Sequence, residues 1–87
     1  FGNTINGVRH QVAAPVLAPQ DGRLRVRVFD ARGRMVRMLL DEQTTAGTHL
    51  VRFNGRDDRG ATLASGRYFV QAETAGVKDV MPVTIVK

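Results

Sequence analysis

A polar, glycine-bearing turn between two strand-like runs, within residues 53–70, constrains the fold of this chain more than any other segment. Phe53 ends the first run, and Arg67 to Val70 form the second. Glycines adopt positive φ without a Cβ clash, and Asn and Asp side chains bond nearby backbone N–H groups. This chemistry predicts a rigid corner between two strands, with a structural role for Asn54, Gly55, Asp57, Asp58, Gly60, Ser65, Gly66 and Tyr68. We call residues 54–68 the signature turn.

The segment from Leu24 to Val28 alternates with the period of a strand that has one wet face. Its aliphatic residues fall on one side and the arginines between them fall on the other. Residues 30–34 then form a turn in which Gly33 is expected to take positive φ, and residues 35–40 return as the second strand of a hairpin.

Other parts of the chain carry weaker strand patterns. They predict an opening strand at 8–12, a polar link at 41–47, and strands at 49–53, 67–73 and 77–86. Pro15 and Pro19 are expected to interrupt the strand pattern after the opening strand. Pro82 cannot donate to a ladder, which indicates an edge strand or a bulge. No segment has the pattern of a helix.

Short strands at ~8–12-residue spacing, joined by glycine-rich turns, predict an all-β fold. We expect an immunoglobulin-like antiparallel β-sandwich of about seven strands, forming one domain over residues 1–87, with residues 1–22 the least defined part. The apolar faces of the strands give the expected core: Leu24, Val26, Val28, Val36, Val51, Phe53, Tyr68, Val70, Val83 and Ile85.

Size and composition exclude several classes of function. A chain of 87 residues needs nearly all its apolar side chains for the core, which leaves little room for an enclosed active site. The absence of cysteine excludes disulfide frameworks, cysteine-based zinc sites and thiol chemistry. No apolar run approaches the ~18 residues of a membrane span, and no signal peptide opens the chain. The unusual Phe1-Gly2 start indicates a fragment or a processed piece.

The residues that commonly carry catalysis do not form a recognisable constellation. His10 and His49 lack metal-ligand spacing, and Asp57-Asp58 lacks the alternating oxygens and terminal glutamate of a calcium loop. No glycine-rich turn follows a phosphate-loop pattern. We therefore expect no catalytic, cofactor-binding or metal-binding residues, and no enzyme activity.

The net charge of +5, with eleven arginines among thirteen basic residues, raises nucleic acid, acidic glycans and anionic membranes as partners. Arg23, Arg25 and Arg27 would project from one strand face, about 6.5–7 Å apart, and so form a basic face. That face could engage phosphates, or its aliphatic stems could simply cover the sheet. Nucleic acid is not the expected partner, because Phe29 is the only aromatic on that face of the strand.

The ordered series of segments resembles a known family. It comprises Val26–Asp30, Gly33–Arg37, Ala46–His49, Phe53–Gly60 and Ala64–Phe69. The series resembles the FlgD-like immunoglobulin-like domain, and it is similar to C-terminal domains of exported enzymes that serve as type IX secretion sorting and cell-attachment modules. The resemblance covers about residues 24–87. Phe53-Asn54-Gly55 departs from the family's usual Trp-Asp-Gly, and Pro82 falls where the family tends to show Lys or Arg.

The resemblance implies a non-catalytic C-terminal module that directs a larger exported bacterial enzyme to the cell surface or outside the cell. Its expected partners are the secretion machinery, the cell envelope and a covalently linked upstream catalytic domain. The recognition surface would lie on Val80 to Lys87 and the adjoining turns, where the chain ends on a lysine. The expected sorting strand within it is Val83, Thr84, Ile85, Val86 and Lys87. A free edge there would pair with a receptor strand by β-addition, and the basic face would add nonspecific attraction to an acidic envelope.

Two other functions remain open at the level of sequence. One is a structural domain of the flagellar hook cap. The other is a carbohydrate-binding accessory module, which would normally present a platform of exposed aromatics. The chain has four Phe, one Tyr and no Trp, and most of these are needed in the core.

Overall fold

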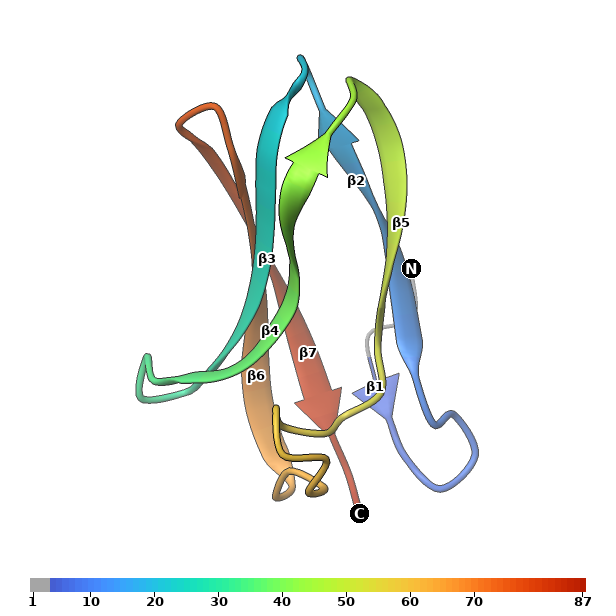
Figure 1. Ribbon diagram of the computed structural model, residues 1–87. Coiled ribbons are helices and arrows are strands. Elements are labelled where there is room, and N and C mark those ends of the chain that lie inside the picture. The colour runs from blue at the N-terminus through green and yellow to red at the C-terminus, as the bar shows by residue number, and fades with distance from the viewer. Residues whose placement is uncertain (1–3) are drawn as a thin grey trace.

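The computed structural model describes residues 4–87 and shows an all-β sandwich of seven strands, without a helix in that range (Figure 1). The strands are β1 (Thr4–Ile5), β2 (Val12–Ala18), β3 (Gly22–Asp30), β4 (Met35–Thr44), β5 (Gly47–Phe53), β6 (Gly66–Thr74) and β7 (Val77–Ile85). The predicted fold class is confirmed. The described part of the chain contains no helix of the length and apolarity needed to cross a membrane.

Two sheets of unequal size form the layers of the sandwich. The larger sheet has the strand order β1-β7-β6-β3-β4, and β2 and β5 pair antiparallel as a two-stranded sheet facing it (Figure 1). Every pairing is antiparallel except that of β1 with β7, which is parallel. β3 and β6 are central strands of the larger sheet, which explains why their inward residues are so thoroughly buried.

The core lies between the sheets and follows the period-two pattern. Eight of the ten expected core residues are buried, whereas Val36 and Val51 are half-buried and pack against the core from the outer strands β4 and β5. The core also contains residues that the pattern did not single out: Ile5, Val12, Val16 and Ala72. Phe53 is only 2 % exposed, which fits its expected role as an apolar anchor.

The β3–β4 hairpin forms as its sequence predicts. Asp30 closes it: its Oδ1 accepts the N–H groups of Arg32 and Arg34 at 2.9 and 3.0 Å, and its own N–H donates to the Arg34 carbonyl at 2.9 Å. Gly33 has a φ of 85°, a conformation that a side chain would disfavour. The Arg34 N–H is the largest cause of a lowered pKa for the Asp30 carboxyl group.

The expected polar link over 41–47 is wrong for most of its length. β4 continues to Thr44, and only Thr45 and Ala46 separate it from β5. The polar side chains of this stretch do not break the strand, because they lie on a strand that borders solvent and meets charged partners on β3. Asp41, for example, is the register partner of Arg25.

The expected opening strand over 8–12 is also wrong. Residues 6–11 form a loop held by Asn6, and Val8 is 92 % exposed. β1 precedes this loop, and β2 begins only at Val12 and runs through Pro15. Pro15 is tolerated because both strands of a two-stranded sheet have an outer edge that needs no ladder bond. The interpretation based on Phe1 and Gly2 lies outside the described residues.

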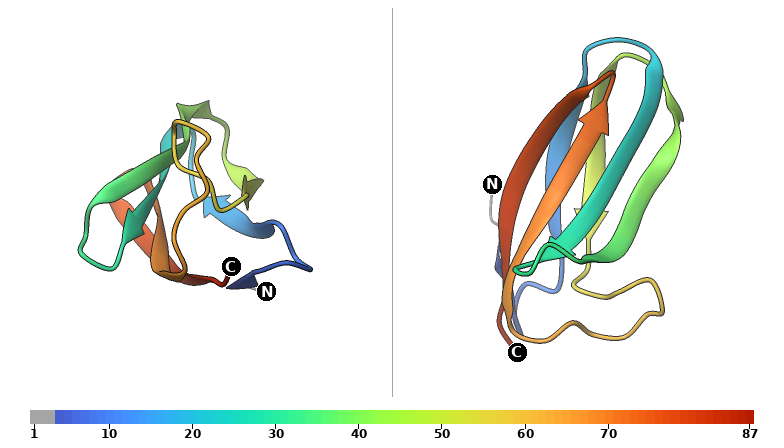
Figure 2. Two further views of the ribbon diagram at one scale, coloured as in Figure 1. Left: turned by 90° about the horizontal axis from the view of Figure 1, so that it is seen from below. Right: turned by 90° about the vertical axis from the view of Figure 1, so that its left-hand side faces the viewer.

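The connections separate into two ends of the sandwich. Loops 6–11 and 31–34, the signature turn and residues 86–87 gather at one end, which we call the loop end (Figures 1 and 2). Short turns between β2 and β3, β4 and β5, and β6 and β7 lie at the opposite end, which we call the tight-turn end.

Candidate functional site

The signature turn is closed by hydrogen bonds within itself. Asp57 Oδ1 accepts the N–H groups of Arg59 and Ala61 at 2.9 and 3.0 Å. The Asp57 N–H donates to the Ala61 carbonyl at 2.9 Å, and the Gly60 N–H donates to the Asp57 carbonyl at 3.0 Å. The carboxylate is therefore engaged in shaping the loop. No three His, Asp or Glu side chains gather as metal ligands within residues 4–87.

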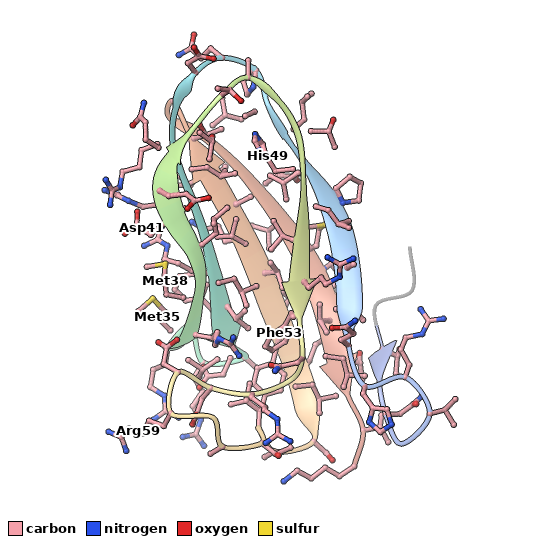
Figure 3. The ribbon with its side chains drawn as sticks, turned by 45° about the vertical axis from the view of Figure 1, so that its right-hand side comes forward. Met35, Met38, Asp41, His49, Phe53 and Arg59 are labelled. Carbon is pink, nitrogen blue, oxygen red and sulfur yellow. The ribbon has the colours of Figure 1, made fainter. Side chains whose placement is uncertain are left out.

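Asp58 joins the turn to the outer edge of β4. Its N–H donates to the Val36 carbonyl at 3.4 Å, and its Oδ1 accepts the Met38 N–H at 3.1 Å. Figure 3 shows Met38 on β4 above the loop that carries Arg59. Asp58 thus takes positions that a neighbouring strand would occupy, and it protects part of an otherwise open sheet edge.

Two arginine side chains, one from β4 and one within the turn, hold the same turn in shape. The Arg37 guanidinium donates to Asn54 Oδ1 and to the Arg56 carbonyl, both at 2.9 Å. Arg56 donates from its side chain to the Gly60 carbonyl at 3.0 Å, and its N–H donates to Asn54 Oδ1 at 3.2 Å. Gly55, between them, has a φ of 75° and is buried against Ile5. These contacts give the turn one defined shape.

Tyr68 anchors the end of the signature turn in the core. Its hydroxyl group donates to the Ala64 carbonyl at 2.7 Å, and the residue as a whole is only 7 % exposed. This is the arrangement of a tyrosine corner, in which a Tyr near the start of a strand bonds the backbone a few residues upstream. Burial, and secondly the Asp30 carboxylate, raise the pKa of Tyr68. A Cβ on Gly66 would lie 3.9 Å from the ring, an ordinary contact, so space alone does not require glycine there.

The end of β7 is less accessible than its sequence suggests. Val83 and Ile85 are buried in the core. Thr84 is paired with Thr4 of β1, and the Val86 N–H donates to the Ile5 carbonyl at 2.8 Å. The expectation that residues 83–87 offer a free edge for β-addition is therefore wrong, because β1 already occupies that edge at Thr84 to Val86.

Lys87 is attached to the signature turn through its backbone. Its N–H donates to the Ser65 hydroxyl oxygen at 2.9 Å. Ser65 thus has a structural contact with the last residue of the chain, and the signature turn and the end of β7 form one continuous surface at the loop end.

The open part of the β7 edge covers residues 77–81, where β6 is the only paired strand among the described residues. The Val86 N–H points toward β1, so the strand period places the N–H groups of Lys78 and Val80 on the same edge. Pro82 shares that edge but has no N–H. Two backbone donors are therefore presented, followed by a proline that limits further pairing.

The basic face is partly neutralised, because its three arginines pair with two carboxylates. Arg23 and Arg25 lie 2.6 and 3.5 Å from Asp41, and Arg27 lies 3.2 Å from Glu73. The Arg23 hydrogen bond is the main cause of a lowered pKa for Asp41 and of a raised pKa for Arg23. The expectation that these arginines attract an acidic envelope is therefore not supported by their surroundings.

The register of β3 with β6 brings together two aromatic residues that the sequence analysis did not pair. Phe69 lies directly opposite Phe29, and the Arg27 guanidinium carbon is 5.6 Å from the centroid of the Phe29 ring. Both rings are half-buried on the outer face of the larger sheet. Only knowledge of the strand pairing reveals this contact, since the two residues are forty positions apart.

Two facing sheets, a corner turn and a tyrosine corner define an immunoglobulin-like β-sandwich. Residues 2–77 match the sequence model of the FlgD Ig-like domain, so the chain belongs to that family. No curated protein matched the chain at a significant level.

Solved structures show the same fold. FlgD from P. aeruginosa superimposes with a TM-score of 0.70 and 22% identity, over 91% of this chain and 67% of that one. PorZ, a surface component of the type IX secretion system of Porphyromonas gingivalis, gives a TM-score of 0.64 and 21% identity, over 98% of this chain and 11% of PorZ. Dimeric latent PorU from the same organism gives 0.59 and 17%, over 94% of this chain and 10% of PorU.

Proposed function

We propose that this domain is a non-catalytic C-terminal sorting and cell-surface attachment module of a larger exported bacterial enzyme that is handled by type IX secretion. The observation that carries the proposal is the fold likeness to PorZ and PorU, of which this chain spans only 11% and 10%. In both proteins the similar unit is a small part of a long chain. This is the setting expected for an accessory module attached to a larger protein.

The chemistry of the signature turn supports a role without catalysis. Asp57 and Asp58 both accept backbone N–H groups and hold the loop against β4. A general acid or base needs a position from which it can exchange a proton with a substrate. Carboxylates that accept backbone N–H groups in this way are better suited to holding the shape of a binding surface than to catalysis.

The surface proposed for recognition is the open edge of β7 over residues 77–81. Val80 is 51 % exposed there, and the strand period directs its N–H to the side of β7 on which no described strand is paired with it. A receptor strand that paired with Lys78 and Val80 would add backbone hydrogen bonds without disturbing the core. Pro82 would fix where such pairing ends.

The test is a fusion of residues 1–87 to the C-terminus of an exported passenger, in a bacterium that has type IX secretion. We expect the fused passenger at the cell surface or in the medium, and the passenger without the domain in the periplasm. Val80→Glu should reduce surface delivery, because it places a charge on the proposed edge. Leu50→Glu is the matched control, since Leu50 is 56 % exposed on β5, away from that edge. Substitution is preferable to deletion of residues 80–87, because Val83 and Ile85 belong to the core.

A second candidate is a structural domain of the flagellar hook cap. It is favoured by the FlgD likeness, which has a TM-score of 0.70 and spans 67% of the FlgD chain. This candidate predicts that a folded fusion remains in the periplasm. Periplasmic retention of the wild-type fusion, with the domain folded, would overturn the sorting proposal and favour the hook-cap function.

A further inference from the structure

The net charge of the protein is confined to one end of the sandwich. Nine of the thirteen basic side chains lie in or beside the loops of the loop end: Arg9, Arg32, Arg34, Arg37, Arg52, Arg56, Arg59, Arg67 and Lys87. Only three of the eight acidic side chains accompany them, Asp30, Asp57 and Asp58, which leaves a formal charge of +6. The tight-turn end and the adjoining strands hold four basic and five acidic side chains, a formal charge of −1.

A cleft of about 450 Å³ lies at the loop end. Three segments that are distant in sequence line it: Ile5 with the β1–β2 loop, residues 54–56 and 62 of the signature turn, and residues 85–87. Ile5 and Ile85 line its base and belong to the core, so the base is rigid. Val86, which is 49 % exposed, contributes apolar surface. None of the described residues that line it is Asp or Glu.

Two asparagines of the cleft are fixed as donors by their own hydrogen bonds. Asn6 Oδ1 accepts the N–H groups of Val8 and Arg9, both at 2.8 Å. Asn54 Oδ1 accepts from Arg37 and from the Arg56 N–H, at 2.9 and 3.2 Å. With the oxygen occupied in each case, the amide NH₂ group is the part of the side chain left for a ligand.

Two cationic side chains complete the lining. One guanidinium nitrogen of Arg56 donates to the Gly60 carbonyl, which leaves its other N–H groups for a ligand. No ion pair within residues 4–87 involves Arg56 or Lys87. Their positive charges come from separate segments, as a dianion with several acceptor oxygens requires. The described lining of the cleft is rich in donors and cations and contains no Asp or Glu side chain.

We infer that this cleft binds a phosphate group, carried on a sugar or free in solution. The two amide groups and the two cations supply hydrogen bonds and charge from different directions, and the exposed Val86 side chain offers apolar surface for the body of a sugar. The inference depends on the cleft and not on the sorting proposal, so either can fail without the other.

The test is a titration of the ¹⁵N-labelled protein followed by ¹H–¹⁵N correlation spectra, with α-D-glucose 1-phosphate, inorganic phosphate and glucose as probes. We expect saturable shifts of amide signals in segments 5–11, 54–56 and 85–87 with both phosphates, and none with glucose. Tighter binding of glucose 1-phosphate would assign a sugar phosphate as the ligand, and equal affinities would assign the phosphate group alone. Absence of saturable shifts with either phosphate would overturn the inference.

Variants distinguish binding at a defined site from nonspecific attraction to the positive charge of the protein. Arg56→Gln combined with Lys87→Gln should raise the Kd about tenfold or more. Arg23→Gln combined with Arg25→Gln removes the same charge at the opposite end and should leave the Kd within about twofold. An equal loss in both pairs would overturn the inference. Because Arg56 also bonds the Gly60 carbonyl, Lys87→Gln alone is a second test that leaves the turn intact, and it should still weaken binding about threefold.

Discussion

At the scale of single residues, Tyr68 links the signature turn to the core through one hydroxyl group. Replacement by Phe keeps the ring in place but removes the hydrogen bond to the Ala64 carbonyl. We expect Tyr68→Phe to lower the free energy of unfolding by about 1–2 kcal/mol, because a donor is lost and a carbonyl loses its partner. Urea unfolding monitored by circular dichroism measures this. An unchanged unfolding midpoint would show that the corner contact contributes nothing to stability.

The raised pKa of Tyr68 also predicts a pH dependence. The folded state retains the phenolic proton at pH values where the unfolded chain, with a pKa of about 10, has lost it. This group therefore leaves stability unchanged well below pH 10 and lowers it as the pH rises through and above that value. Urea midpoints between pH 8 and 11 should show a decline that is smaller in Tyr68→Phe. An identical decline in both proteins would assign it to other groups.

Phe53 should be the most sensitive single position in the smaller sheet. Its side chain is almost fully buried, so Phe53→Ala leaves a cavity and should cost about 3–5 kcal/mol. Leu50→Ala on the same strand is the control and should cost about 0.5 kcal/mol or less, since Leu50 faces solvent. Thermal unfolding of the two variants compares them. Similar losses would mean that burial does not set the difference.

At the scale of elements, the sequence predicts the strands whose signal is local. The alternation of β3 and β6 is complete within each segment, and the structure shows both as central strands. β1 could not be found in this way, because two residues carry no period and their place depends on the register with β7. The covering of the end of β7 by β1 could not be predicted either, because it is a long-range contact that no local sequence pattern indicates.

In the candidate site, too, the contacts within one segment were predictable from the sequence, and the contacts between separate elements were not. The internal bonds of Asp57 span four residues and follow from turn chemistry alone. The contact of Asp58 with Met38 and the ion pairs of Asp41 with Arg23 and Arg25 join separate elements. The sequence suggested a face of unpaired arginines, whereas in the structure each of the three has a carboxylate partner, because the pairing register decides which charges meet.

The contact between Asp58 and β4 yields a prediction for an element. Asp58→Ala removes the acceptor of the Met38 N–H and should lower stability by about 1 kcal/mol. Hydrogen exchange at Met38 should accelerate more than exchange in β3 or β6, because the outer edge of β4 loses its protection. Asp79→Ala on β7 is the control, since Asp79 is exposed. Unchanged exchange at Met38 would show that the turn does not shield the edge.

At the scale of the whole molecule, the sandwich is an electric dipole as well as a scaffold. A formal charge of +6 near the loop end and −1 on the rest creates a field that orients the domain before any specific contact forms. The chain reaches position 87 at the same end, beside the signature turn. An anionic surface would therefore attract the end that carries the cleft, and the tight-turn end would face away.

This asymmetry predicts that the position of a charge matters more than the total. Arg59→Gln combined with Arg67→Gln removes two arginines that have no acidic partner within the described residues, whereas Arg23→Gln combined with Arg25→Gln removes two that share Asp41. Both pairs lower the net charge from +5 to +3. On a cation-exchange column at neutral pH, the first pair should elute at clearly lower salt than the second, because the resin engages the loop end. Equal elution of the two pairs would mean that the field is effectively uniform and that the loop end has no special affinity for an acidic surface.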